Sequence, residues 1–296
     1  MPCGALQSTT PLTFADPLAS LAALTMSTRQ YVAAAVQLGA GSDKTANLDK
    51  VEAFAAEAAR HAARLVVLPE VFLWRGPRTE EQGAAEPIPG PSSNRLGELA
   101  RQLNLHLLAG SILETSGQAR VFNTSVLFDP RGQIVTRYRK IHLFDVDIPA
   151  HVTIRESDTR IGGEAVVTAP TELGVIGMSI CYDLRFPELY RQLTLSGAEI
   201  VTVPSAFTFP TGAAHWELLL RARAIENQVY MIAPDQIGRS PAGVLDFGNS
   251  MIVDPWGTPV ARAADREMVV CAEIDRDYLE RIRRELPCLA HVKLAR

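Results

Sequence analysis

Residues 174–190 read GVIGMSICYDLRFPELY, and the rest of the chain can be interpreted around this stretch. The apolar run at residues 175–180 is long enough for a buried strand and too short for a convincing helix. Cys181 follows directly at the end of this run. Phe186 and Pro187 then begin a helix, and proline is tolerated in the first helical turn because the N–H that it lacks would have no partner within the helix. A thiol at the carboxyl end of a buried strand, facing a helix start, lies where open α/β sheets bind their ligands.

Strand-like and helix-like segments alternate on both sides of this stretch. Short apolar runs predict strands at residues 31–38, 64–70, 106–112, 199–204 and 229–234. Helices are expected at residues 48–63, 94–103, 186–197, 213–227 and 277–285. Strands that alternate with helices in this way predict parallel sheets with crossover helices.

The remaining segments predict antiparallel pairing. Residues 121–128 and 132–140 flank a turn at residues 129–132 and are typical of a hairpin. Further strands are expected near residues 165–168, 249–253, 259–263 and 268–274. So many strands exceed a single small sheet, whereas a two-sheet core with helices outside both faces accommodates them.

The chain is expected to form a single domain over residues 29–296, because no Pro-, Gly- or Ser-rich linker interrupts the patterned sequence. Residues 1–28 contain no Lys or Arg and are rich in small and apolar residues. A signal peptide needs a basic start and a denser apolar centre, and a mitochondrial transit peptide needs arginines. We therefore expect residues 1–28 to be a disordered tail or an over-extended start.

Composition limits the possible partners. The chain of 296 residues is 47% hydrophobic and 21% charged, as in ordinary soluble globular proteins, and its net charge is -4. Neither nucleic acid nor a membrane is an expected partner for this mixed charge. The four cysteines form no C-x-x-C pair, which argues against a zinc site and a disulfide framework and favours a reducing, cytoplasmic compartment.

Three residues at predicted strand ends are candidates for chemistry. Cys181 alone is most often a buried core residue. Glu70 follows the run LVVLP, and a desolvated carboxylate there would have the raised pKa that suits a general base. Lys140 is predicted to share a strand face with Ile134 and Tyr138, where its positive charge could stabilise a developing oxyanion. Each of the three also has an ordinary structural interpretation.

Other reactive patterns have little support. His142, His151 and His215 have no spacing that pairs them with Cys181, and a G-x-S-x-G nucleophile motif is missing. The chain also lacks H-E-x-x-H and paired-carboxylate motifs, so no catalytic metal is expected. One helical stripe is most simply the buried face of its helix: Trp216, Leu219, Leu220 and Ile225.

Taken together, three sequence words resemble the nitrilase (carbon–nitrogen hydrolase) superfamily. They are LPE, which ends at Glu70, YRKIHLFD, which contains Lys140, and CYDLRFPE, which begins at Cys181. Further similar words are AVQ, VPSAF, HWELLLRARAIENQVY and GNSMIVDPWG, and the similarity extends over residues 29–287. The words look most like the amidase branch that acts on deaminated glutathione, with the ω-amidase branch its nearest relative.

The resemblance implies a four-layer αββα sandwich, with two mixed sheets between helix layers, and a homo-oligomer that is a dimer or tetramer. It also implies a Glu-Lys-Cys triad in which Cys181 attacks an amide carbonyl and Glu70 accepts the thiol proton. Lys140 and the backbone N–H of Tyr182 would stabilise the oxyanion, and Glu156 would position Lys140 or the substrate. No cofactor is needed for this chemistry.

The implied substrate is a small-molecule amide, most simply deaminated glutathione, which yields 2-oxoglutarate and Cys-Gly. Arg185 is expected to bind its α-keto-acid carboxylate, because a guanidinium suits that geometry. Phe207 and Thr208 are expected pocket walls. The alternatives are ω-amidase activity on 2-oxoglutaramate or a related small amide or nitrile, and a non-catalytic binding protein with this fold. The branch usually has histidine where Asn249 stands, and the C-terminal residues LPCLAHVKLAR differ from its usual ending.

Overall fold

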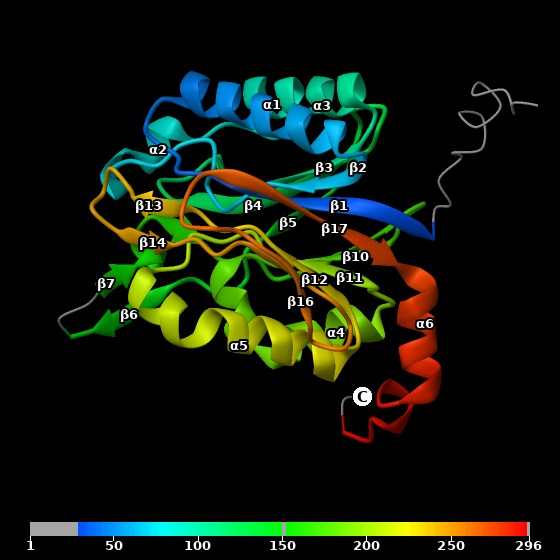
Figure 1. The fold of residues 1–296 in the computed structure, drawn as a ribbon. Helices are drawn as coiled ribbons and strands as arrows, with labels where there is room; N and C mark the ends of the chain where they lie inside the picture. Colours follow the sequence, from blue (N-terminus) through cyan, green and yellow to red (C-terminus); the bar gives the residue numbers. More distant parts are fainter. Residues whose placement is uncertain (1–28, 150–151, 295–296) are drawn as a thin grey trace, which may run out of the picture.

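Two mixed β-sheets form the centre of the molecule (Figure 1). The structure is a computed structural model that describes residues 29–149 and 152–294. The expectations for residues 1–28 and for His151 therefore lie outside the described residues. In the described part of the chain, no helix combines the length and apolar character that crossing a bilayer requires.

The first sheet has seven strands, in the order β17-β1-β2-β3-β4-β5 with β8 beside β4. Its central pairs, β1 with β2 and β2 with β3, are parallel, and antiparallel strands flank them. The strands are β1 (Gln30–Gln37), β2 (Ala63–Val67), β3 (His106–Glu114), β4 (Val121–Phe128), β5 (Ile134–Arg139), β8 (Arg160–Ile161) and β17 (Met268–Asp275).

The second sheet has six strands, in the order β16-β15-β12-β11-β10-β9. It repeats the same plan, because β10, β11 and β12 are parallel and antiparallel strands flank them. The strands are β9 (Thr168–Thr171), β10 (Gly174–Met178), β11 (Ile200–Thr202), β12 (Tyr230–Ala233), β15 (Met251–Val253) and β16 (Pro259–Arg262).

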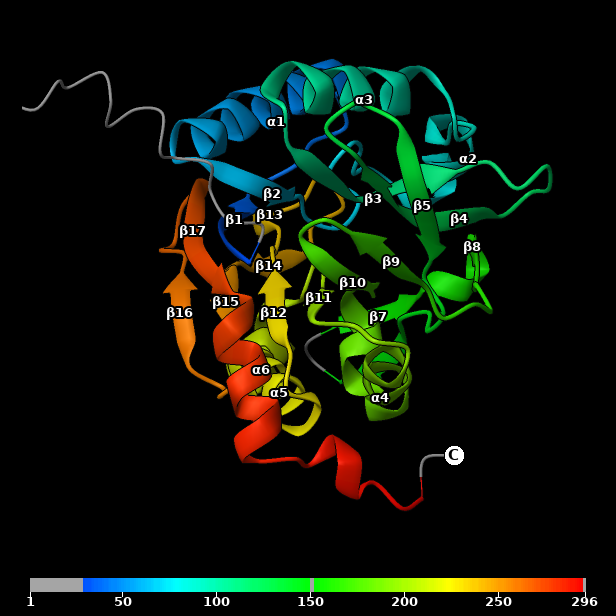
Figure 2. The ribbon, with the colours of Figure 1, turned by 90° about the vertical axis from the view of Figure 1, so that its right-hand side faces the viewer.

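Helices cover the outer face of each sheet. The helices are α1 (Lys44–Arg60), α2 (Glu81–Ala84), α3 (Pro91–Leu103), α4 (Pro187–Leu195), α5 (Phe209–Asn227) and α6 (Arg276–Glu285). Figure 1 shows α1 and α3 outside the first sheet, and α4 and α5 outside the second. Figure 2 shows α6 running from β17 down the side of the second sheet. The predicted αββα sandwich is thus confirmed.

Strand alternation separates two hydrophobic cores. On β1, Ala33 and Ala35 point between the two sheets, where they join residues of the second sheet such as Ile176. The intervening Ala34 and Val36 point to the opposite face and pack with residues of α1 and α3. Because successive side chains of a strand face opposite ways, a strand buried on both faces reads as a continuous apolar run. This explains the unbroken apolar runs in the sequence.

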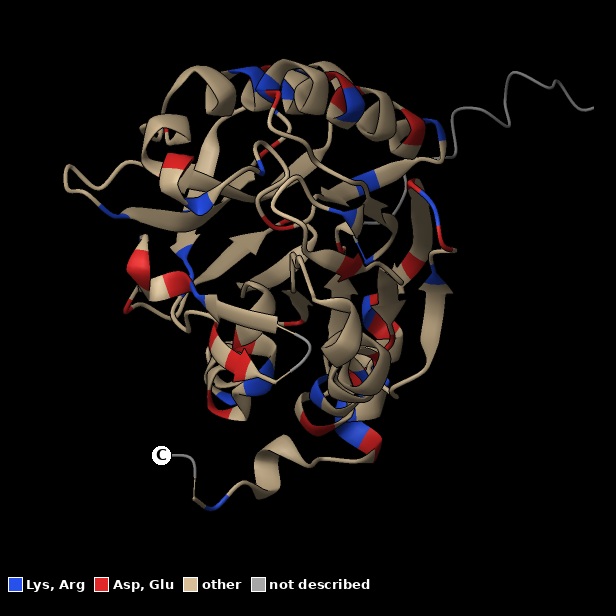
Figure 3. Ribbon diagram, turned by 90° about the vertical axis from the view of Figure 1, so that its left-hand side faces the viewer, with Lys and Arg blue, Asp and Glu red and all other residues tan. Residues whose placement is uncertain are grey.

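The loops at one end of the sandwich carry additional small elements (Figure 1). Two hairpins lie there, β6 (Asp145–Ile148) with β7 (Val152–Arg155), and β13 (Ile237–Arg239) with β14 (Leu245–Phe247). Short 3-10 helices occupy Arg78–Glu80, Glu156–Asp158, Cys181–Arg185 and Leu289–His291. Positive and negative residues mix along the outer helices, whereas most of the strand ribbon is uncharged (Figure 3).

Several sequence expectations need correction. The β6–β7 hairpin lies in a segment predicted to be a loop, and the strand expected near residues 165–168 is displaced to β9. Ile134 is 37% exposed, so it does not share the buried environment of Tyr138 and Lys140, because the start of the edge strand β5 projects into solvent. Ile225 is 49% exposed, so the predicted buried stripe of its helix is wrong at that position.

Candidate active site

Glu70 lies in the turn that follows β2, three residues beyond its last residue, Val67. The predicted strand was therefore too long, but the carboxyl-end placement holds. The backbone N–H of Glu70 donates to the Ser205 carbonyl over 3.3 Å, which ties this turn to the second sheet. Val71 then adopts a φ of 45°, a left-handed conformation that is strained for a β-branched residue. Its N–H donates to Ser111 Oγ over 2.9 Å, which holds the turn in place.

Cys181 occupies the corresponding position after β10. Its N–H donates to the Pro204 carbonyl over 2.9 Å, at the end of the neighbouring strand β11. Its φ is 49°, and such left-handed conformations in residues other than glycine cost about 1–3 kcal/mol and cluster at functional sites. Cys181 is the first residue of the 3-10 helix Cys181–Arg185, which connects the strand to α4.

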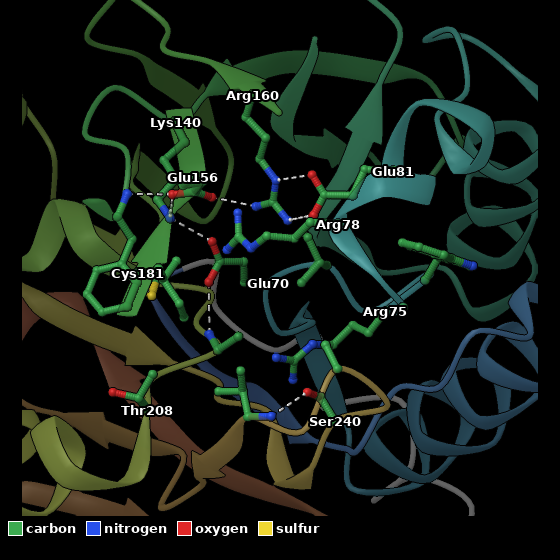
Figure 4. Close-up of a pocket in the computed structure, with 18 of the residues that line it drawn as sticks. Glu70, Arg75, Arg78, Glu81, Lys140, Glu156, Arg160, Cys181, Thr208 and Ser240 are labelled. Atoms are coloured by element: carbon green, nitrogen blue, oxygen red, sulfur yellow. Dashed lines mark hydrogen bonds and ion pairs between the residues drawn. The ribbon is translucent and has the colours of Figure 1, made fainter. Parts of the chain in front are cut away.

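Lys140 follows β5 and points toward Glu70 and Glu156 (Figure 4). The residue is only 2% exposed, although a lysine is almost never fully buried unless it is paired. Its Nζ donates to Glu70 Oε1 and to Glu156 Oε2, both over 2.9 Å. Lys140 therefore bridges two buried carboxylates.

Other groups hold the oxygens of Glu70 and Glu156. Asn123 Nδ2, on β4, donates to Glu70 Oε1 over 2.8 Å and contacts Glu156 Oε1 at 3.4 Å. The second oxygen of Glu70 accepts the N–H of Ala206 over 2.9 Å. Glu156 Oε2 also accepts the N–H of Phe144 over 2.6 Å. Each buried carboxylate is therefore fixed from several directions, as buried charge requires.

A second layer of charge adjoins this cluster. Arg160 donates to Glu156 Oε1 through Nη1, and to Glu81 through Nη2 over 2.7 Å and through Nε over 3.1 Å (Figure 4). Arg160, Glu81 and Asn123 are not among the residues predicted from the sequence. Asn123, inside the predicted strand VFNTSVLF, was a usable signal, because a buried amide needs a polar partner. No local pattern connects Arg160 with Glu81.

These contacts shift several pKa values. Burial alone would lower the pKa of Lys140, but the Glu156 and Glu70 carboxylates raise it above its ordinary value. Burial alone would raise the pKa of Glu156, but Lys140 and Arg160 hold it well below its ordinary value. Burial, reinforced by the charge of Glu70, raises the pKa of the Cys181 thiol well above its usual range. The resting site thus contains a neutral thiol beside an ammonium group.

Cys181 opens onto two hollows. The larger is a cavity of about 270 Å³, whose lining includes Glu70, Lys140 and Glu156. The smaller hollow, of about 10 Å³, has room for no more than about one water molecule. It is lined by Tyr182, Arg185 and Phe207 among others, and it shares Phe144, Cys181, Ala206 and Thr208 with the cavity. Elements far apart in the chain therefore meet at one thiol.

The predicted substrate-binding residues lie on the side of the smaller hollow. The Arg185 guanidinium carbon lies 5.2 Å from the Phe207 ring centre and 5.7 Å from the Tyr182 ring centre. Thr208, which borders both hollows, has its hydroxyl 2.9 Å from that of Thr211. The structure thus places Tyr182, Arg185, Phe207 and Thr208 beside Cys181, and their roles remain predictions.

The histidines that the structure describes do not pair with the thiol. His142 stacks on Phe186 at 3.6 Å between ring centres, and its Nδ1 lies 2.7 Å from Asp183 Oδ1. His215 Nδ1 lies 3.3 Å from an Arg185 nitrogen.

Asn249, with a φ of 56°, donates to the Phe247 carbonyl in a turn. The expectation that the site needs no metal or cofactor stays a prediction.

The arrangement combines three chemical capacities in one place. The Glu70 carboxylate can accept a proton from the neighbouring thiol. The Lys140 ammonium can stabilise negative charge that develops nearby. The Cys181 sulfur can attack an electrophilic carbon held in the cavity.

Comparisons with known proteins agree with this chemistry. The family model of the carbon–nitrogen hydrolases matches residues 32–284. The chain is 41% identical over 267 residues to a deaminated glutathione amidase of Synechocystis sp., covering 89% of this chain and 98% of that protein. It is 38% identical over 256 residues to an ω-amidase of Mus musculus, covering 86% of this chain and 92% of that protein. A solved Saccharomyces cerevisiae member of branch 10 of the nitrilase superfamily superimposes with a TM-score of 0.81 at 34% identity, covering 90% of this chain and 97% of that one.

Proposed function

The chain belongs to the carbon–nitrogen hydrolase family, and from that premise we propose that it is a thiol amidase that hydrolyses deaminated glutathione to 2-oxoglutarate and Cys-Gly. The observation that carries this proposal is the buried contact of Lys140 with Glu70 and Glu156 beside the Cys181 thiol, at a cavity of about 270 Å³. Similarity to a deaminated glutathione amidase at 41% identity supports the choice of substrate.

In the first half of the reaction, Cys181 Sγ attacks the amide carbonyl carbon and Glu70 takes the thiol proton. A general base is needed because the pKa of the thiol is raised, so little thiolate exists at rest. Lys140 Nζ and the Tyr182 N–H stabilise the tetrahedral oxyanion. Glu70 then passes its proton to the amide nitrogen, the C–N bond breaks, and the amine leaves a thioester on Cys181.

The second half reverses these roles with water as the nucleophile. Glu70 takes a proton from water, whose oxygen attacks the thioester carbon, and the oxyanion groups act again. The C–S bond then breaks, the acid is released, and the proton on Glu70 returns to the thiolate. The net change is one water consumed for one amide bond cleaved.

The remaining predicted residues have supporting roles in this proposal. Glu156 holds the Lys140 ammonium at 2.9 Å, so we assign it to positioning. Arg185, which lines the smaller hollow at Cys181, would bind the carboxylate of the acyl group. Phe207 and Thr208 would form walls against that acyl group.

ω-Amidase activity on 2-oxoglutaramate is the second candidate. The cavity of about 270 Å³ is at the lower end of ordinary ligand pockets, which run from about 300 Å³, and so favours a small substrate. The 38% identity to a mouse ω-amidase also supports this candidate. Both reactions share the same acyl group and differ in the amine that leaves.

The test is to measure kcat/KM of the purified enzyme on deaminated glutathione, 2-oxoglutaramate and a simple nitrile, with release of 2-oxoglutarate as the readout for the two amides. We expect the highest value on deaminated glutathione. A higher value on 2-oxoglutaramate would replace the leading proposal with the second. Binding of these amides without turnover would instead support a non-catalytic binding protein.

We also expect a homo-oligomer, a dimer or tetramer, in the cytoplasm. Leu218 is 69% exposed and lies seven residues before the half-exposed Ile225, so both occupy one face of α5. Trp256, also exposed, lies in the turn beside Ile225, and exposed apolar patches mark interaction sites. Free thiols at Cys181, Cys271 and Cys288 fit a reducing compartment.

A further inference from the structure

Four cationic side chains line the cavity, and three of them have anionic partners. Lys140 is held by Glu70 and Glu156, and Arg160 by Glu156 and Glu81. Arg75 donates through both terminal nitrogens to Asp246, whose carboxylate is buried. The fourth cation is Arg78, from the 3-10 helix that precedes α2.

Arg78 has a different environment. Its side chain makes no hydrogen bond or ion pair with residues 29–149 or 152–294, and its Nη1 atom is buried without a partner. Figure 4 shows the guanidinium pointing into the pocket, beside Glu70 and Arg160. Burial and the charge of Arg160 lower its pKa, and the carboxylates of Glu81, Glu156 and Glu70 partly offset this effect. A guanidinium stays protonated at neutral pH. A buried charged donor without an acceptor is costly, and at the wall of a cavity a bound ligand can supply that acceptor.

The position of Glu70 indicates which half of an amide substrate Arg78 faces. Glu70 and Arg78 line the larger cavity but not the smaller hollow, whereas Arg185 lines only the smaller hollow. In the proposed reaction Glu70 protonates the amide nitrogen, so this nitrogen must lie within hydrogen-bonding reach of Glu70. The departing amine and everything attached to it therefore extend into the cavity that contains Arg78.

We propose that Arg78 binds a carboxylate on the amine leaving group, and that it sets the preference of the enzyme for amides of anionic amines over amides of ammonia. This inference rests on the proposed amidase function and extends it to the leaving group. Cys-Gly carries such a carboxylate, and two extended residues reach about 7 Å from the amide nitrogen. A guanidinium suits this ligand, because it can donate two parallel hydrogen bonds to one carboxylate.

The test compares three amides with the same 2-oxoglutaryl acyl group. Their leaving groups are Cys-Gly, Cys-Gly with a neutral C-terminal carboxamide, and ammonia. The wild type should prefer the acid to the carboxamide by about 10- to 100-fold in kcat/KM, mainly through KM. Arg78→Met should reduce that preference to about threefold or less. Arg78→Lys should keep more of the preference than Arg78→Met, because lysine keeps the positive charge but cannot donate two parallel hydrogen bonds.

Two further variants separate the inference from general damage. Arg185→Met should weaken all three substrates to a similar extent, because they share the acyl group. Arg131→Met removes an exposed arginine in a turn and should leave all three values unchanged.

The outcomes distinguish the two proposals. A wild type that does not discriminate between acid and carboxamide, or an Arg78→Met variant that keeps the preference, would overturn the role of Arg78 alone. A wild type that cleaves only 2-oxoglutaramate would contradict both the role of Arg78 and the deaminated glutathione proposal. Loss of activity on all three amides in Arg78→Met, with the preference unchanged, would make Arg78 a structural residue.

Discussion

Cys181 and Cys271 are two thiols in the same sandwich with very different surroundings. Both have a raised pKa, mainly because of burial, with a nearby glutamate adding to the shift in each case. Cys271 lies within β17, paired with Ala34 of β1, and packs against the outer core beneath the helices. Cys181 lies after its strand, in a left-handed turn beside Lys140. Burial alone therefore does not make a nucleophile, which also needs a proton acceptor and a positive charge.

The largest expected effect comes from removing each thiol in turn. Cys181→Ala should lower kcat on the best amide substrate by about 10⁴-fold or more, because no covalent intermediate can form. Cys271→Ala should leave kcat within about twofold, because the removed thiol lies outside the cavity, and it serves as the matched control. Both variants should keep the far-ultraviolet circular dichroism of the wild type. Substantial activity in Cys181→Ala would show that the reaction does not require the Cys181 thiol.

Alkylation tests the difference in reactivity between Cys181 and Cys271 without any substrate. Iodoacetamide carries a primary amide, and we expect it to modify Cys181 at least about tenfold faster than Cys271, because Glu70 can accept the proton of Cys181. The rate at Cys181 should rise with pH, since its pKa lies above the usual range. Peptide mass spectrometry over time measures both sites in one sample, and Glu70→Gln should remove most of the advantage. Equal slow labelling of the two thiols would indicate an inert Cys181.

The smallest expected effect is a sensitivity to acid that the surroundings of Cys271 lack. Lys140 and Arg160 hold the pKa of Glu156 well below its ordinary value of 4.5. Because folding lowers the pKa of Glu156, its carboxylate stabilises the folded protein above the ordinary value of 4.5. This stabilisation is lost progressively as the pH falls below 4.5 toward the pKa of the folded state.

Denaturant titrations of Glu156→Gln should test this sensitivity. The variant should be less stable than the wild type near neutral pH, and the difference should shrink by about 2 kcal/mol on going to about pH 3. Cys271→Ser, measured alongside, should show no such change with pH. A difference for Glu156→Gln that does not depend on pH would contradict the charged state assigned to Glu156.

Local sequence was sufficient to place a site residue that follows a buried strand. Glu70 and Cys181 could both be placed at strand ends, because apolar runs mark parallel strands and polar residues end them. The strand before Glu70 was nevertheless predicted to continue to residue 70, whereas β2 ends at Val67. Periodicity does not resolve such an end, because the turn is as apolar as the strand. The family resemblance joined Lys140 and Glu156 to these two residues.

The surrounding charges could not be predicted in the same way. Arg160 and Glu81 are 79 residues apart, and Arg75 and Asp246 are 171 residues apart. Such pairs depend on how distant loops meet at one end of the sandwich, and no local spacing encodes that meeting. Arg78 looks like an ordinary loop arginine in the sequence, and only the structure shows its Nη1 buried without a partner.

The most direct test of whether Cys181 is the nucleophile is to look for the acyl group on its sulfur. The enzyme is mixed with the best amide substrate, quenched in acid within the first turnovers, digested, and examined by mass spectrometry. We expect a 2-oxoglutaryl thioester on the peptide that contains Cys181, with none on the peptides that contain Cys271 or Cys288. Rapid turnover without any acyl group on Cys181, or an acyl group on another residue, would contradict it.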